Sequence, residues 1–208
     1  MKNIEWTDIT LNPVVGCRYS CPYCYARKIN DRFHFVEDFN KPEIFVERLK
    51  RLKSIKNKKV FLNSMSDIAY WDNTIIETVV NYMNRYSSNE YYLLTKNVRS
   101  KEAFNGITAN KVWIGLTITR QKDLDNYFNY CESSDIRYNL INIEPILENI
   151  NLDGLDNCKK IILGAETGNR KDKVVPRREW VEQIINFCKE NNIELFLKEN
   201  IKKLAGIY

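Results

Sequence analysis

The feature that most constrains the fold of this chain is the alternation of short apolar runs with helical patterns. Seven runs of apolar, β-branched or aromatic residues have the length expected of buried strands. The runs are Thr10–Val15, Lys59–Asn63, Tyr91–Leu94, Lys111–Leu116, Tyr138–Ile143, Lys160–Leu163 and Ile193–Leu197. Between them, apolar residues at i, i+3 and i+4 predict helices over Ile44–Leu52, Asn73–Tyr86, Asp123–Cys131 and Arg178–Glu190, with Asp72 or Asn73 as the N-cap of the second.

Strands that alternate with helices usually pair in parallel through right-handed crossovers. The sequence therefore predicts the α/β class, as an open or partial (β/α) barrel of about six or seven parallel strands. No linker, internal repeat or low-complexity tract divides the chain, which contains only 7 Gly and 5 Pro in 208 residues. We therefore expect a single domain over residues 1–208.

Hydropathy and charge indicate where in the cell the protein is expected. No segment approaches the roughly 18 consecutive apolar residues of a membrane span, and the first eight residues lack the apolar core of a signal peptide. We therefore expect a cytoplasmic protein without a membrane partner. The net charge of +5, from 32 basic and 27 acidic residues, is compatible with an anionic partner but does not require one.

The cysteines carry the strongest chemical signal. Cys17, Cys21 and Cys24 form a C-x3-C-x2-C cluster, whereas Cys131, Cys158 and Cys188 are scattered and are expected to be ordinary thiols. Without a secretion signal, a tight cluster is typical of metal binding or catalysis. Three thiolates are one short of a closed zinc site or a four-Cys cluster. On a 4Fe–4S cube they would leave one iron open to another ligand.

The spacing favours an iron–sulfur cluster, but two alternatives stay open. One is a zinc site completed by a distant side chain, and the other is three unligated thiols. The single histidine, His34, makes two-His metal sites and a Ser-His-Asp triad poor candidates. We expect His34 to be structural.

Polar residues follow the predicted strands at one end. In parallel α/β folds the carboxyl ends of the strands carry the chemistry, so these residues should converge. They are the cysteine loop, Asn63–Asp67, Thr95 and Lys96, Thr117 and Thr119, Asn142–Glu144, Gly164–Glu166, and Lys198. The basic segment Arg170–Arg178 should lie at the rim of this site, where solubility and the binding of an anionic substrate explain it equally well. Lys56–Lys59 precede a strand and belong to the opposite face.

The cysteine cluster lies in a motif that resembles a known family. The run Cys17-Arg18-Tyr19-Ser20-Cys21-Pro22-Tyr23-Cys24 resembles the C-x3-C-x-aromatic-C motif of the radical S-adenosylmethionine (SAM) superfamily. Further phrases resemble a phage-associated branch of unassigned function. They occur in the expected order over nearly the whole chain: Ile4–Asp8, Asn12–Cys17, Asn63–Asp67, Leu94–Lys96, Glu144-Pro145 and Gly164–Gly168.

The resemblance implies an activity and its cofactors. Cys17, Cys21 and Cys24 would hold a 4Fe–4S cluster whose fourth iron binds SAM. Reductive cleavage of SAM would give a 5′-deoxyadenosyl radical that abstracts hydrogen from a substrate, for which a nucleotide or nucleic acid is a reasonable hypothesis. A reductant protein such as a flavodoxin or ferredoxin is the implied partner. Two other functions stay open: a non-catalytic Fe–S or SAM-binding module, and a zinc-stabilised nucleic-acid-binding domain.

The resemblance also suggests which side chains meet the cofactor. Tyr23 occupies the position whose backbone contacts adenine, and Asn63, Ser64, Met65 and Ser66 stand where the superfamily usually has a Gly-Gly-Glu strand end that receives the methionine amino group. Thr117 and Thr119 are candidates for the ribose hydroxyls. Asn142 and Ile143 are expected to flank the adenine, and Gly164 and Ala165 offer the small side chains that a stacked base needs.

Four charged residues at strand ends are the predicted catalytic or substrate-binding groups. They are Lys96, Glu144, Glu166 and Lys198. Each should face inward, where an unpaired charge is costly. The alternative interpretation is that they form structural ion pairs that brace the barrel.

Overall fold

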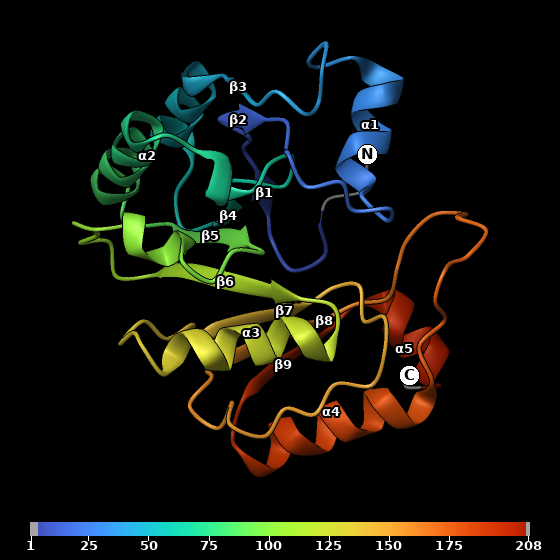
Figure 1. Ribbon diagram of the computed structural model, residues 1–208. Helices are drawn as coiled ribbons and strands as arrows, with labels where there is room; N and C mark the ends of the chain where they lie inside the picture. The colour runs from blue at the N-terminus through green and yellow to red at the C-terminus, as the bar shows by residue number, and fades with distance from the viewer. Residues whose placement is uncertain (1–3, 207–208) are drawn as a thin grey trace. The chain divides into compact units, whose positions relative to one another are not determined.

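The computed structural model describes residues 4–206. Seven strands form one sheet, in the order β1 (Ile9–Thr10), β4 (Lys59–Phe61), β5 (Glu90–Thr95), β6 (Val112–Ile118), β7 (Leu140–Ile143), β8 (Lys160–Leu163) and β9 (Glu194–Leu197) (Figure 1). The pairs β1–β4, β4–β5, β6–β7, β7–β8 and β8–β9 are parallel. The predicted α/β partial-barrel class is confirmed.

The chain divides into two compact units, Met1–Ile114 and Gly115–Tyr208, called the amino-terminal and carboxy-terminal units below. The expectation of a single domain stays a prediction. Within the described residues, no helix is long and apolar enough to cross a membrane.

The amino-terminal unit contains β1, β4 and β5 with helix α2 (Asn73–Arg85) and the 3₁₀ helix η1 (Val46–Ser54) beside them. Helix α2 forms because Asp72 caps it by accepting from the Ile75 N–H at 2.9 Å, as predicted. Its buried residues, Ile75, Ile76, Val79, Val80 and Met83, recur at helical spacing. The unit also contains α1 (Tyr25–Phe33) and the short helices η2 (Ile68–Tyr70) and η3 (Ser100–Ala103).

Two predicted elements of this unit are wrong in detail. The run Thr10–Val15 is not one strand, because Pro13 has no N–H with which to continue a ladder. The chain instead forms β1 and then β2 (Val14–Val15), which pairs antiparallel with β3 (Glu43–Ile44). Ile44 consequently belongs to a strand, and the predicted helix over Ile44–Leu52 begins at Val46 as a 3₁₀ helix.

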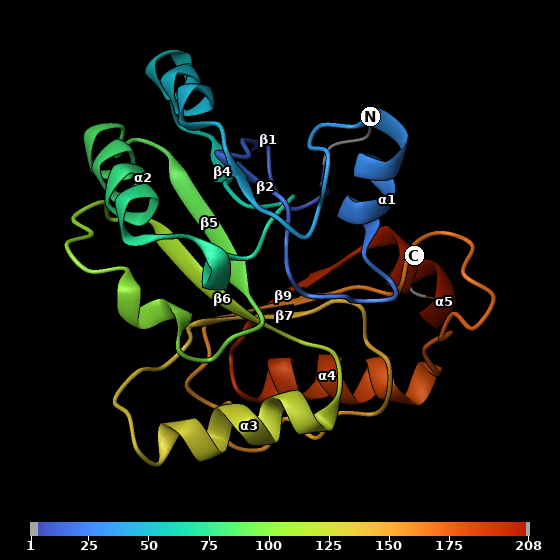
Figure 2. The same cartoon turned by 45° about the horizontal axis from the view of Figure 1, so that its top comes forward.

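The carboxy-terminal unit contains β6 from Gly115 onward, β7, β8 and β9. Helices α3 (Gln121–Cys131) and α4 (Arg178–Glu190) lie on the same face of these strands (Figures 1 and 2), and α5 (Glu199–Ala205) follows β9. The register aligns Thr117, Asn142, Ile162 and Phe196 across the four strands. Strand β6 extends two residues beyond the predicted run, so Thr117 lies within the strand rather than after it.

Candidate functional site

The cysteine loop, residues 17–24, connects β2 to α1 in the amino-terminal unit and is held at both ends. At its start, the Gly16 N–H donates to the Met65 carbonyl at 2.9 Å, and the Cys17 N–H donates to the Phe39 carbonyl at 2.7 Å. At its end, Cys24 is the N-cap of α1, where its Sγ accepts from the Arg27 N–H at 3.4 Å. The loop therefore has a defined conformation set by backbone groups.

Gly16 makes this closure possible. Its φ of +113° is one that side-chain-bearing residues rarely adopt. A Cβ on this residue would lie 2.8 Å from Pro42 Cα and 3.1 Å from the Phe39 carbonyl oxygen. The backbone of the segment before β3 thus crosses directly over Gly16.

Arg27 holds the cysteine loop in place, although its position in the sequence did not predict this contact. Its guanidinium donates to the carbonyls of Cys17 (3.4 Å) and Tyr19 (3.3 Å) and to Asn40 Oδ1 (2.9 Å). Its Cζ also lies 5.0 Å from the centre of the Phe39 ring. All three acceptors surround one guanidinium nitrogen, Nη2, which shares its two hydrogens among them, so Arg27 fastens α1 to the loop that precedes it. The only sequence signal for this role is that Arg27 stands three residues after the last cysteine of the motif. The helix that carries it, α1, was not predicted.

The three thiols lie close enough to influence one another electrostatically. Cys17 and Cys24 pack against an apolar cluster of Val15, Ala26, Val36, Phe39 and Met65. The pKa of the Cys17 thiol is raised to about 12, chiefly by burial and to a smaller extent by the adjacent Asp67, Cys24 and Cys21. Burial also raises the pKa of the Cys24 thiol. Because only thiolates bind metals, coordination here must release protons.

The three cysteines supply soft thiol donors that are not gathered around one point. Among residues 4–206, no three His, Cys, Asp or Glu side chains converge closely enough to hold one metal ion. In a four-iron cube each thiolate binds a different iron, so the sulfurs need to be neighbours without sharing a coordination shell. Soft thiolates are also the donors that such clusters take.

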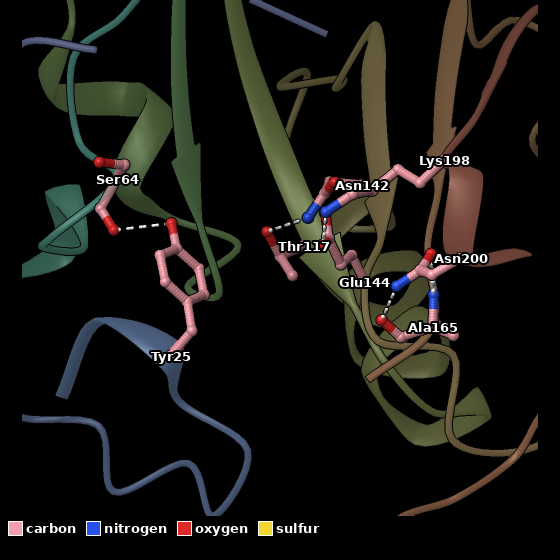
Figure 3. A network of polar contacts seen from close by, with 8 residues as sticks. All are labelled: Tyr25, Ser64, Thr117, Asn142, Glu144, Ala165, Lys198 and Asn200. Carbon is pink, nitrogen blue, oxygen red and sulfur yellow. Dashed lines mark hydrogen bonds and ion pairs between the residues drawn. The ribbon is translucent and has the colours of Figure 1, made fainter. Parts of the chain in front are cut away.

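The residues after β4 lie beside the cysteine loop. Ser64 and Met65 are fastened to Asn12, whose Oδ1 accepts from Ser64 Oγ at 3.0 Å and from the Met65 N–H at 3.1 Å. The Tyr25 hydroxyl donates to the Ser64 carbonyl at 2.8 Å (Figure 3). The loop after β4 and the start of α1 are therefore joined directly.

Asn63 and Ser66 are also engaged by neighbours. The Asn63 amide continues the ladder of β5, because its Oδ1 accepts from the Leu94 N–H (2.8 Å) and its Nδ2 donates to the Leu94 carbonyl (2.6 Å). Ser66 Oγ accepts from Trp71 Nε1 at 3.1 Å. Each serine hydroxyl keeps further hydrogen-bonding capacity, whereas the Asn63 amide is occupied by backbone.

Asp67 has a structural role that the sequence reasoning did not assign. The buried carboxylate accepts from the Ala69 N–H (2.9 Å), Thr95 Oγ1 (2.7 Å) and the Lys96 N–H (2.9 Å). Burial raises the pKa of this carboxyl, although the three donors oppose the rise. Asp67 thereby joins the loop after β4 to the end of β5.

Lys96 and Tyr23, both predicted site residues, contact each other. The Lys96 Nζ lies 5.5 Å from the centre of the Tyr23 ring, close enough for a cation–π interaction. Lys96 belongs to the segment after β5 and Tyr23 to the cysteine loop, so the structure brings these two predicted residues together.

In the carboxy-terminal unit, Thr117 and Asn142 face each other across β6 and β7. Asn142 Nδ2 donates to Thr117 Oγ1 at 3.3 Å (Figure 3). Asn142 is 4% exposed, and its Oδ1 has no hydrogen-bond partner within the described residues. A buried acceptor without a donor is costly, and such groups are common where a ligand completes the site.

Thr119 and Ile143 have other contacts. The Thr119 hydroxyl donates to Asp123 Oδ2 at 2.9 Å, near the start of α3. Ile143 is fully buried, and its carbonyl accepts from the Gly164 N–H at 3.0 Å. Thr119 thus helps to begin a helix, and Ile143 contributes to the sheet.

Glu144 and Lys198 form an ion pair that passes over Gly164. Glu144 follows β7, Gly164 follows β8 and Lys198 follows β9, and the Lys198 ammonium donates to Glu144 Oε1 (Figure 3). A Cβ on Gly164 would lie 2.8 Å from Lys198 Cδ and 3.1 Å from Glu144 Cγ. The Lys198 and Glu144 side chains therefore fill the space that a side chain at position 164 would occupy.

Glu166 makes a second buried pair, with Arg170. The Glu166 carboxylate is 0% exposed and accepts from Arg170 Nε (2.8 Å) and from the second guanidinium nitrogen (2.9 Å). This two-point bond holds the pKa of Glu166 below its usual value. Neighbouring Ala165 is fixed by Asn200, whose amide pairs with the Ala165 N–H (3.2 Å) and carbonyl (2.8 Å) (Figure 3).

Comparison with known proteins identifies the family. A protein family described as Protein of unknown function (DUF5131) matches residues 1–203. The chain belongs to this family. No curated protein matches the chain significantly.

Solved structures that resemble this member of the DUF5131 family are those of spore photoproduct lyase. A variant with a tyrosine-to-phenylalanine substitution matches with a TM-score of 0.57 at 8% identity, covering 88% of this chain and 74% of that chain. A variant with a cysteine-to-alanine substitution gives a TM-score of 0.55 at 9% identity with the same coverage, and its complex with dinucleoside spore photoproduct gives 0.55 at 8%. Spore photoproduct lyase is a radical SAM enzyme, so the fold implied by the cysteine motif is the fold observed.

Proposed function

We propose that this protein is a radical SAM enzyme in which Cys17, Cys21 and Cys24 hold a 4Fe–4S cluster. When bound, the cluster and SAM supply a one-electron cleavage that yields a hydrogen-abstracting radical. The observation that carries the proposal is the set of three free, partly buried thiols on one short loop whose two ends are held by backbone hydrogen bonds. The fold shared with a radical SAM enzyme supports it.

The chain's own contribution begins with orientation. Arg27 and the N-cap position of Cys24 set the path of the cysteine loop, and Tyr25 fastens it to the segment after β4. The apolar cluster behind Cys17 and Cys24 limits access of water to their sulfur atoms. These residues keep the donor atoms in place before any cofactor arrives.

We assign the cofactor contacts of the amino-terminal unit to the loop after β4. The hydroxyls of Ser64 and Ser66 are our candidates to accept bonds from the methionine ammonium, because both keep acceptor capacity beyond their internal bonds. Asn63 and Met65 then serve as supports for this loop. Tyr23 is proposed to contact the adenine through its backbone.

We assign the contacts of the carboxy-terminal unit to its strand ends. Asn142 is the strongest candidate, since its buried Oδ1 can accept from an amino group of a nucleoside. Thr117 is its neighbour and a candidate for a ribose hydroxyl. We propose that Thr119, Ile143, Gly164 and Ala165 shape this edge of the sheet without binding the cofactor through their side chains, because internal contacts already occupy these residues.

Lys96, Glu144, Glu166 and Lys198 remain our candidates for the charged groups that contact the substrate. Three of them are held in ion pairs, so they would present charges at fixed positions. A nucleotide or nucleic acid is the proposed substrate class, supported by the likeness to a lyase solved with a dinucleoside photoproduct. A flavodoxin or ferredoxin is the proposed reductant, and membership of a phage-associated branch is a further hypothesis.

The test is anaerobic reconstitution of the full chain with iron and sulfide. We expect absorbance near ~400 nm, an EPR signal after reduction by dithionite, and formation of 5′-deoxyadenosine from SAM. Replacing Cys17, Cys21 or Cys24 by Ala should abolish cluster binding and SAM cleavage. Cys131→Ala is the matched control, because that half-buried thiol lies outside the cluster and should leave both unchanged.

Two results would contradict the proposal. Stoichiometric zinc bound with four protein donors would support the zinc-stabilised domain instead. A cluster that binds SAM but leaves it intact in well-folded protein would support a non-catalytic module.

A further inference from the structure

Three partly buried segments of the amino-terminal unit carry more positive than negative side chains. Residues 17–28, 64–71 and 95–101 together contain the cations Arg18, Arg27, Lys28, Lys96, Arg99 and Lys101 and only one carboxylate, that of Asp67. Asp67 is 7% exposed, and its oxygens accept three hydrogen bonds from within the unit. The negative charge in these segments is therefore buried while the positive charges lie nearer to solvent.

The three segments touch one another through tyrosines and cations. Arg18 Cζ lies 5.7 Å from the centre of the Tyr70 ring, and Tyr19 packs edge-on against Tyr70 at 5.1 Å. Lys96 Nζ lies 5.5 Å from the centre of the Tyr23 ring. We call Arg18, Tyr19, Tyr23, Tyr70 and Lys96 the tyrosine–cation rim. Three of these residues belong to the cysteine loop, Tyr70 to the segment after β4 and Lys96 to the segment after β5.

The rim differs from an ordinary solvated basic surface in two respects. Among residues 4–206, neither Arg18 nor Lys96 forms a direct ion pair with a carboxylate, and although Lys96 also attracts the buried Asp67 carboxylate, the exposed Arg18 can meet an external anion. Each also lies over an aromatic face rather than extending freely into water. A ligand that fits must carry negative charge and flat rings at short intervals.

A single strand of nucleic acid has this chemistry. Its phosphates attract Arg and Lys, and its unpaired bases stack on tyrosine rings, each stacked base contributing about 1–3 kcal/mol. A duplex offers phosphates but keeps its bases stacked on each other, and an acidic protein surface offers charge without repeated flat rings. The combination on the rim therefore favours the single strand.

We propose that the tyrosine–cation rim binds single-stranded nucleic acid, with Arg18 and Lys96 on phosphates and Tyr70 and Tyr19 under bases. The inference rests on the proposed function only in naming this strand as the substrate. Binding itself needs no cluster, because every residue of the rim is held by protein contacts.

The experiment measures fluorescence anisotropy of a labelled oligothymidylate of ~20 nucleotides with the full chain, before and after reconstitution, from about 50 to about 200 mM salt. Arg18→Ala should weaken binding about ten-fold and reduce the salt slope by about 0.7, the value for one phosphate contact on a single strand. Tyr70→Leu should weaken binding about ten-fold, while Tyr70→Phe, which keeps the ring, should stay within about two-fold.

Lys53→Ala is the matched control. Lys53 is exposed on η1, within segment 48–59, which contains no acidic residue and leads to the start of β4 rather than following its end. This variant should bind within about two-fold of the unchanged protein. Circular dichroism checks the fold of each variant. If Tyr70→Leu fails to fold, the test rests on Arg18→Ala, because Arg18 is exposed.

Four outcomes overturn the inference. They are absence of oligonucleotide binding, equal weakening by Lys53→Ala and Arg18→Ala, unchanged binding by Tyr70→Leu, and Arg18-dependent capture of an acidic flavodoxin in place of the oligonucleotide. The proposed function is judged separately: SAM cleavage without oligonucleotide binding sinks only the rim, and oligonucleotide binding without SAM cleavage sinks only the radical chemistry.

Discussion

The two compact units treat the charged residues at their strand ends differently. In the carboxy-terminal unit, Lys198 pairs with Glu144 and Arg170 pairs with Glu166, so each cation is neutralised by a carboxylate. In the amino-terminal unit, Arg27 binds backbone carbonyls, and Arg18 and Lys96 lie over tyrosine rings. Carbonyls and rings attract a cation without cancelling its charge.

This difference separates two kinds of support. Ion pairs between neighbouring strand ends brace a sheet edge and leave little net charge. Backbone bonds around the cysteine loop fix its shape while positive charge stays available for an anion. The predictions below test whether each unit depends on its own kind of support.

The largest effect is expected from Gly16→Ala. The substitution forces a Cβ to 2.8 Å from the backbone of Pro42 at a φ of +113°, and backbone strain plus overpacking should cost about 3 kcal/mol of unfolding free energy. Urea denaturation measures the loss, and limited proteolysis locates it at the cysteine loop. Gly106→Ala is the control for overpacking: Gly106 also has a positive φ, +72°, but a Cβ there meets nothing within 4 Å, so this variant should lose less stability. Equal losses for the two variants would show that the crossing backbone does not hold the loop.

Glu166→Gln should have the next largest effect and a defined pH dependence. Loss of the two-point bond to Arg170 should cost about 2 kcal/mol at neutral pH. Because Arg170 lowers the pKa of Glu166 in the folded state, the wild-type advantage is present above the unfolded-state pKa of about 4.3 and disappears as pH falls through the lower folded-state pKa.

Urea denaturation of both proteins from neutral to acidic pH checks this curve. The matched control is Glu182→Gln, which removes the exposed pair with Arg178 and should barely change stability. A wild-type advantage that persists unchanged at the lowest pH would contradict the role given to the carboxylate.

Gly164→Ala should have a smaller effect than Gly16→Ala, because the Cβ meets side-chain atoms that can move. Displacing Lys198 and Glu144 should cost about 1.5 kcal/mol of unfolding free energy. A double-mutant cycle with Lys198→Ala measures the coupling, and removal of the long side chain should relieve much of the cost. Additive effects would show that the pair does not fill the space above Gly164.

Asn142→Leu should have the smallest effect on stability and a larger one on binding. The change removes a buried oxygen without a partner, which should offset the lost bond to Thr117 and leave the unfolding free energy within about 1 kcal/mol. Equilibrium dialysis of the reconstituted protein should show weaker SAM binding. A strong loss of stability with unchanged SAM binding would make Asn142 a structural residue.

Much of the fold followed from local pattern. The strand–helix alternation and the N-cap of α2 were predicted, because periodicity and capping depend on residues close in the chain. The errors lie where a distant segment intervened. Pro13 ended one strand, and the segment that leads into β3 claimed Ile44 for a second, antiparallel pair.

The site was predictable only in part, for the same reason. The cysteine spacing marked the cluster ligands, but Arg27 became visible as a clamp only when α1 placed it over the loop carbonyls. Asp67 stood beside the predicted serines, yet its partners lie 28 or 29 residues away after β5.

The sequence by itself determined the α/β class and the trio of thiols, since both are written in short-range spacing and residue type. Only the tertiary structure decided which charges are cancelled, because pairing depends on register and loop crossing between distant residues. Lys198 and Glu144 are 54 positions apart and meet above Gly164, which has no side chain. Arg18 and Lys96 instead contact tyrosine rings. Their charges stay without a direct carboxylate partner because backbone and side-chain hydrogen bonds hold their loops beside these rings.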